Sequence, residues 1–232
     1  MSLSRMAPAV PSHPGPRARG GGAGGVLLAN DFFHIVHDVG SGKLRLNSRA
    51  AGLGLAGALL GELILNNNLH VASGTLSLTG AQPPADDLGY RIVRQLTADQ
   101  QTRSLRTWLA FLSQSALERV AVRLAREGEI EPVKSRKLFG SSVRYLPVDP
   151  KVAAWPSDRL YGLVNRGDPL DFHDAMLAGL VAVTGFTKGV WWDGDAVTLR
   201  HIAAAVGSMP MSMREVLAHT EAAVGDATLS PR

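Results

Sequence analysis

The chain contains no cysteine among its 232 residues, which excludes disulfides, thiolate zinc sites and a cysteine nucleophile. Because this composition suits a reducing compartment, we expect a cytoplasmic protein. Long hydrophobic runs are also missing. The longest covers residues 50–65 and includes Glu62, and it is shorter than the roughly 20 residues that cross a bilayer. Residues 1–25 hold no apolar run of secretory-signal length, so we expect neither export nor a membrane span.

Catalytic signatures are absent too: the sequence has no nucleophile elbow, no HExxH helix and no Walker loop. His34 and His37 lie three apart in a segment that we expect to be extended, so they would point to opposite faces. Asp171, His173 and Asp174 lie where a helix is expected to begin, and acids there favour capping over metal binding. We therefore predict no catalytic residues, no metal and no cofactor.

The glycine pattern Gly52-x-Gly54-x-x-Gly57 matches a dinucleotide-binding fingerprint. Its context does not match, because no buried parallel strand precedes it and no acid follows about 20 residues later. We predict instead that these glycines allow close helix packing.

The apolar and turn-forming residues predict a mainly α, compact multi-helix domain with a few short β-hairpins. Residues 1–25 form a Pro, Gly and Arg-rich tail expected to be disordered, 26–225 a single domain, and 226–232 a flexible C-terminus. A capping pair, Ser212 with Glu215, is expected to begin the last helix. The expected hairpins cover residues 32–46, 69–79 and 130–147, and the expected helices cover 55–65, 88–96, 103–111, 115–127, 151–165, 169–184, 195–206 and 211–224.

Charge is distributed unevenly along the chain. The net charge is +4, and the middle of the chain, residues 97–151, is its most basic part, whereas residues 152–232 are acidic. Within the middle part, the third hairpin interleaves cations with apolar side chains, a pattern that suits an anionic membrane surface. An ordinary solvated hairpin is the alternative interpretation. The cations are Lys134, Arg136, Lys137 and Arg144, and the apolar residues are Leu138, Phe139 and Tyr145.

A second aromatic feature is the pair Trp191-Trp192, which precedes a turn. An exposed turn would display the pair to solvent, but we predict that it belongs to the core.

The order of these segments resembles the Golgi phosphoprotein 3 family. The resemblance rests on the turn at residues 40–44, GLAGALLGELIL at 54–65, LERVAVRLAREGEIE at 117–131 and KLFGSSVRYLPVDP at 137–150. It implies a mainly helical domain without enzymatic activity, attached peripherally to membranes through phosphatidylinositol 4-phosphate. In eukaryotes the family also holds the cytosolic tails of Golgi glycosyltransferases as a sorting adaptor. The hairpin at 131–147 is linked in the family to self-association and membrane contact.

The family's headgroup pocket uses a Trp and three Arg. The positions that align with them here are Asn47, Ala56, Gln114 and Leu117. Other cations nearby, namely Arg45, Arg49 and Arg119, could contact phosphates instead. The Ala, Gly, Val and Arg-rich composition is typical of a GC-rich bacterial genome, which would make the eukaryotic adaptor role inapplicable.

Our leading hypothesis is a non-enzymatic, cytoplasmic, peripheral membrane protein that binds anionic phospholipid headgroups. The predicted lipid contacts are Arg45, Arg49, Arg119, Lys134, Arg136, Lys137 and Arg144, and Leu138 and Phe139 are the predicted membrane or oligomer contacts. The alternative is an adaptor that docks peptide tails without lipid, which the acidic C-terminal third suggests. A homo-oligomer through the hairpin is a further expectation. Nucleic acid is not an expected partner, because no motif that reads it is present.

Overall fold

The structure is a computed structural model that describes residues 27–80, 82–84, 86–99, 101, 103–136, 141–191 and 196–229. The predicted tail at 1–25, the tip residues Lys137, Leu138 and Phe139, and Trp192 lie outside the described residues.

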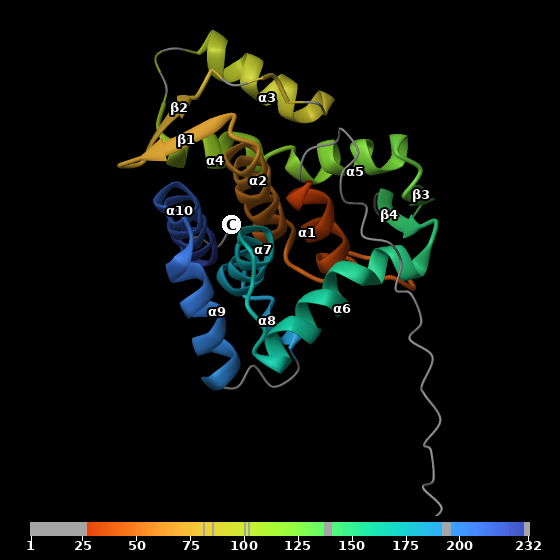
Figure 1. Cartoon of the computed structure of the whole chain (residues 1–232). Coiled ribbons are helices and arrows are strands. Elements are labelled where there is room, and N and C mark those ends of the chain that lie inside the picture. The colour runs from red at the N-terminus through yellow and green to blue at the C-terminus, as the bar shows by residue number, and fades with distance from the viewer. Residues whose placement is uncertain are drawn as a thin grey trace, which may run out of the picture.

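A buried central helix, α2 (Ser48–Leu65), organises the domain. Its small and aliphatic side chains are apolar on every side, which favours a helix enclosed by others. Figure 1 shows α2 surrounded by α1 (Leu28–Val36), α4 (Leu105–Ser113), α7 (Phe172–Val183) and α10 (Met211–Leu229), all of which contact it. Among the described helices, α2 alone is long and apolar enough to cross a membrane, but 78% of it is buried inside the domain.

The glycines of α2 allow this close packing, as predicted. A Cβ on Gly54 would lie 2.5 Å from the Cζ of Phe32, and one on Gly52 would lie 2.6 Å from the carbonyl oxygen of Ser113. A Cβ on Gly57 would meet the hydroxyl of Thr220 at 2.7 Å. Each glycine therefore marks a place where another element touches the α2 backbone.

Two antiparallel hairpins pack on the helices and contribute Leu69, Val71, Leu76 and Ile130 to the core. This mainly α architecture confirms the predicted fold class. β1 (Leu69–Ala72) pairs with β2 (Thr75–Leu78), and β3 (Ile130–Arg136) pairs with β4 (Ser141–Pro147). Trp191 is buried, as predicted. The remaining helices are α3 (Asp87–Ala98), α5 (Ala116–Arg126), α6 (Pro150–Arg166), α8 (Thr187–Val190) and α9 (Ala196–Ser208).

The hairpin expected over residues 32–46 is wrong. Its first half is the helix α1, and the only β feature left among the described residues of this segment is an isolated bridge between His37 and Leu44. α1 packs against α2, α5, α6 and α7, so eight of its nine residues are buried. A short segment buried on all sides shows no helical stripe, and its periodicity cannot distinguish it from a buried strand. His34 consequently lies in the last turn of α1, with its Nε2 3.2 Å from Glu129.

The predicted capping pair in α10 is also wrong. The helix begins at Met211, so Ser212 lies inside it. The Ser212 hydroxyl donates to the Val71 carbonyl at 2.8 Å and accepts from the Val71 amide at 3.1 Å. Glu215 accepts from the backbone amides of Ser73 and Gly74. Both side chains therefore attach the β1–β2 hairpin to α10 instead of capping the helix.

Candidate functional site

The basic hairpin β3–β4 presents its cations on both faces. Lys134 is opposite Val143, and Val133 is opposite Arg144. Because residues opposite each other share a face and neighbours alternate, Lys134 and Arg144 point to different sides. Lys134 is exposed and Arg144 is half-buried. The backbone of Arg136 ends β3, and its side chain lies outside the described part of the structure.

A turn between α1 and α2 packs directly on this hairpin. The carboxylate of Asp38 accepts from the Ser41 amide at 2.8 Å and from the Ser41 hydroxyl at 2.6 Å, and these bonds lower the pKa of Asp38. The Tyr145 amide in β4 donates to the Gly42 carbonyl at 2.9 Å. Gly42 has φ +63, and a Cβ there would lie 2.7 Å from the Tyr145 carbonyl oxygen. Only glycine therefore lets the turn sit this close to β4.

This contact brings a second group of cations to the hairpin. Lys43 and Arg45 lie in and just after the turn and are exposed. The guanidinium carbon of Arg45 lies 5.1 Å from the centre of the Phe186 ring, a cation–π contact that leaves its N–H groups available. Arg49 is exposed in the first turn of α2. We call Lys43, Arg45, Arg49, Lys134 and Arg144 the basic surface.

The cations of the basic surface form no close ion pairs with described carboxylates, and Asp38 in the same turn attracts Arg45 over a longer distance. None of the five cations has a carboxylate within 4.0 Å among the described residues. Of these five, Lys43 was missed by the sequence analysis, because a lysine in a turn is unremarkable until the turn is placed against β4. The sequence signal that could have indicated Lys43 is its position directly after Gly42 and close to Arg45 and Arg49.

The positions that align with the family's headgroup residues have structural roles here. Asn47 caps α2, and its Oδ1 accepts from the Arg49 amide at 2.9 Å. Ala56 is completely buried in the middle of α2. Gln114 is the exposed C-cap of α4, and Leu117 is partly buried against the core. None of the four carries a positive charge.

Arg119 lies in a different place from the hairpin cations. It lines a groove of about 630 Å³ between α3 and α5, and no described hairpin residue takes part in that lining. We call this the α3/α5 groove; its lining includes Arg91, Arg94, Gln95, Arg119, Val122 and Arg126.

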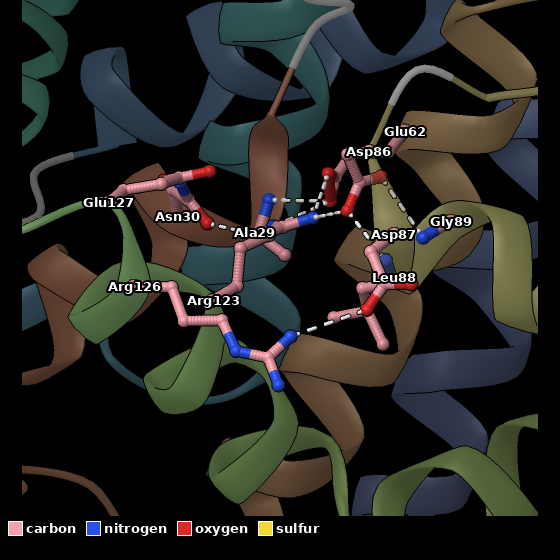
Figure 2. A network of polar contacts seen from close by, with 10 residues as sticks. All are labelled: Ala29, Asn30, Glu62, Asp86, Asp87, Leu88, Gly89, Arg123, Arg126 and Glu127. Carbon is pink, nitrogen blue, oxygen red and sulfur yellow. Dashed lines mark hydrogen bonds and ion pairs between the residues drawn. The ribbon is translucent and has the colours of Figure 1, made fainter.

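A buried polar network, drawn in Figure 2, shares Arg123, Asp86 and Glu127 with the lining of the α3/α5 groove. Arg123 binds Glu62 through two hydrogen bonds, of 3.0 and 3.2 Å, with both side chains at most 7% exposed. The Nε of Arg123 donates to Asn30 at 2.8 Å, and its Nη1 lies 3.3 Å from Asp86. The Ala29 amide also donates to Glu62. The network therefore connects α1, α2, α5 and the start of α3.

Burial dominates the electrostatics of this network. It raises the pKa of Glu62 to about 7, because the cost of removing the carboxylate from water outweighs the attraction of Arg123. In the sequence, Glu62 lies inside an apolar run, which indicates that its carboxylate is buried beside a cation. The run does not indicate that Arg123 is this cation. Asp86 also accepts from the amides of Leu88 and Gly89 and so caps α3.

The cluster Asp171, His173 and Asp174 is occupied by a protein cation. Its candidate ligand atoms lie within 4.8 Å of one another, but the Nη2 of Arg159 lies 2.7 Å from Asp174 and 3.2 Å from the Nδ1 of His173. Arg159 also pairs with Asp31 at 3.0 Å. Asp171 accepts from the Asp174 amide at 2.8 Å, which confirms the predicted cap. The cluster joins α1, α6 and α7 and is built as an ion-pair network.

Two comparisons with known proteins bear on this arrangement. The search of curated proteins returned no match. The family model described as Golgi phosphoprotein 3 (GPP34) matches residues 28–222, which is nearly the whole described part of the chain. The mainly helical fold with two hairpins agrees with the expectation drawn from that resemblance. The chain belongs to the Golgi phosphoprotein 3 family.

Proposed function

We propose that this protein is a non-enzymatic, cytoplasmic protein that attaches peripherally to membranes by binding anionic phospholipid headgroups through the basic surface. The observation that carries the proposal is that five cations, from the hairpin, from the turn packed on β4 and from the start of α2, have no ion-pair partner within 4.0 Å among the described residues. Cations that the fold does not neutralise are available to phosphate groups outside the protein.

A contrast within the same chain supports this interpretation. Arg123 and Arg159 are each held by two carboxylates, so their charge is used to connect helices. Lys43, Arg45 and Lys134 are exposed. Lysines and arginines at a membrane surface each contribute about 1 kcal/mol of attraction to anionic lipid, so the basic surface supplies a useful binding energy without a deep pocket.

Family membership gives independent support, since the Golgi phosphoprotein 3 resemblance implies phosphatidylinositol 4-phosphate as the ligand. The neutral residues at the four aligned headgroup positions favour a less selective attraction to anionic lipid. Arg136 and Lys137 remain predicted lipid contacts, and Leu138 and Phe139 remain predicted membrane or oligomer contacts. Arg119, also predicted as a lipid contact from the sequence, lines the α3/α5 groove and lies outside the basic surface.

Co-sedimentation with vesicles tests the proposal. Three vesicle types are compared at low and high salt: neutral lipid alone, neutral lipid with phosphatidylserine, and neutral lipid with phosphatidylinositol 4-phosphate at matched total charge. We expect binding to both anionic types that is lost at high salt, because exposed charges are screened. A strong preference for the phosphoinositide would show that the ligand of the family is retained.

The decisive variant is Arg45→Glu with Lys134→Glu. Losing two cations worth about 1 kcal/mol each should weaken vesicle binding about 30-fold or more. Arg106→Glu with Arg200→Glu is the charge-matched control: it changes the net charge equally at exposed residues of α4 and α9, which Figure 1 shows on the other side of the domain from β3–β4. Because Arg106→Glu also breaks an ion pair with Asp226, circular dichroism checks that this control is folded. Equal losses in both variants, or no binding of the natural protein to any vesicle, would contradict the proposal.

A further inference from the structure

The α3/α5 groove runs between two helices that lie side by side in opposite directions (Figure 1). At one end, Arg126 in the last turn of α5 lies 3.4 Å from Asp87 in the first turn of α3. At the other end, Arg119 near the start of α5 and Gln95 near the end of α3 line the same groove. The concavity therefore follows the length of both helices and is large enough for an elongated ligand.

The groove continues into an apolar hollow. A second concavity of about 540 Å³ shares Gln95 and Ala98 with the groove and is completed by α4, chiefly by Trp108 and Phe111. Phe111 is 42% exposed, and Val122 in the groove itself is 44% exposed. Large apolar side chains exposed inside a concavity are typical of a surface that another molecule covers.

Positive charge lies along the groove. Arg94 and Arg119 have no carboxylate within 4.0 Å among the described residues, and Arg91 and Arg126 share the single carboxylate of Asp87. Among the acidic residues of the lining, Glu118 is exposed and has no cation within 4.0 Å among the described residues. The other acids of the lining are engaged, Asp86 by Arg123 and Glu127 by Asn30. The free hydrogen-bonding capacity of the groove is therefore mainly that of arginine donors.

We propose that the α3/α5 groove docks an acidic amphipathic peptide segment of a partner protein, with its carboxylates on Arg94 and Arg119 and its apolar side chains over Val122 and Phe111. An amphipathic helix laid in a groove between two helices is a recurrent mode of peptide recognition. Arginine binds carboxylates through paired hydrogen bonds, so acidic side chains gain more here than neutral ones.

Two features favour a peptide over a lipid bilayer. The arginines and apolar side chains line a concavity between two helices, whereas a flat bilayer surface contacts groups that project. The buried Oε1 of Gln95 has no hydrogen-bond partner among the described residues, and an unpaired buried acceptor costs about 1–3 kcal/mol. A rotation of this amide toward the groove would let it accept from a donor of the occupant, which a peptide supplies in its polar side chains.

The test uses three fluorescein-labelled peptides of the same helical design. Each carries a stripe of Leu and Phe at helical spacing, and the polar face contains Glu, Gln or Lys. Binding to the full chain is measured by fluorescence anisotropy. We expect the Glu peptide to bind at least 10-fold more tightly than the Gln and Lys peptides. Arg94→Glu with Arg119→Glu should abolish that preference, and Arg106→Glu with Arg200→Glu should retain it.

A second variant, Val122→Ser with Phe111→Ser, should weaken the Glu peptide through lost apolar contact while leaving the order of the three peptides unchanged. Circular dichroism on each variant checks that the fold is intact. Equal affinity for the three peptides, or a preference that survives the reversal of both arginines, would overturn the proposal. If the arginine reversal instead weakened vesicle binding and the peptides showed no order, the groove would belong to a membrane surface. Vesicle binding through the basic surface is scored separately, so either proposal can fail alone.

Discussion

The buried pair Arg123 and Glu62 gives the sharpest stability prediction. Replacing Arg123 by Met leaves the carboxylate of Glu62, which is 5% exposed, without its bidentate partner. Removing one member of a buried ion pair costs about 3–5 kcal/mol, because the remaining charge is desolvated and uncompensated. Arg123→Met should therefore lose a large share of the roughly 5–15 kcal/mol by which a domain is stable.

The double variant should be more stable than this single one. With Glu62→Met added to Arg123→Met, no uncompensated charge remains at the centre of the network, and two apolar side chains replace the pair. The Ala29 amide and the side-chain carbonyl of Asn30 lose their partners in the double variant, which limits its recovery. Asp86 loses its contact with Arg123, but its side chain is 23% exposed and can reach water. Buried pairs replaced together by apolar residues are often close to neutral in stability, so we expect a coupling energy of at least about 2 kcal/mol.

The assay is chemical unfolding of the four proteins of this double-mutant cycle at pH 8 and pH 5.5. In the natural protein, burial raises the pKa of Glu62 to about 7. The folded state then binds a proton more tightly than the unfolded state between the usual pKa of 4.5 and 7, so this group's contribution to stability falls as pH rises through that window. Without Arg123 the carboxyl should protonate more readily still, so the cost of Arg123→Met should shrink at pH 5.5. Additive effects of the two substitutions, or a cost independent of pH, would refute the reasoning.

Two further predictions concern α1 and its packing on α2. Burial lowers the pKa of His37 from 6.5 to about 4. The unfolded state therefore binds a proton before the folded state does, and the free energy of unfolding falls as the pH drops from 6.5 toward 4. His37→Gln should remove about 3 kcal/mol of that loss, measured as the difference between the pH profiles of unfolding free energy of the two proteins. Gly54→Ala places a Cβ 2.5 Å from the Phe32 ring and should lower the free energy of unfolding by about 1–3 kcal/mol. Gly207→Ala in α9, where a Cβ would meet nothing within 4 Å, should raise it by about 0.5–1 kcal/mol. Equal effects at the two glycines would contradict the packing argument.

Much of the fold could be predicted because its elements carry local signals. The residues of α2 are small and aliphatic all round, and its glycines fit close packing, so a helix over 55–65 followed from the sequence, whereas the start of α2 at Ser48 did not. The turn at Ser73 and Gly74 likewise predicted the β1–β2 hairpin, and both residues have positive φ. In contrast, the segment around Phe32 and Phe33 in α1 is buried on every side. Such a segment has the same sequence pattern as a buried strand, because no exposed face shows the helical period of apolar residues.

The candidate site was only partly predictable, because its charges are set by tertiary contacts. Composition indicated that the middle of the chain is basic. It did not indicate that Gly42 would place a turn on β4, or that Arg119 would face α3. Ser212 and Glu215 show the same limit: their spacing fits a helix cap, yet both bind the backbone of a hairpin about 140 residues away in sequence. A local sequence rule assigns a hydrogen-bond partner within one helical turn. In the folded chain, the backbone of the β1–β2 hairpin lies within hydrogen-bonding distance of both side chains instead.

The four aligned headgroup positions show why the fold and the ligand have to be argued separately in this chain. Asn47 supplies the cap of α2, and Ala56 lies wholly within the core, so an arginine at residue 56 would have to displace packed side chains. With Asn47 and Ala56 at these positions the helix packing is intact, but the chain lacks the Trp and the Arg that the family resemblance implies there for headgroup binding. An anion site in this protein must therefore be assembled from other cations. The five cations of the basic surface are the ones that we propose for it, because they come from a hairpin, from the turn packed on it and from the start of the following helix, and because none forms an ion pair within 4.0 Å among the described residues.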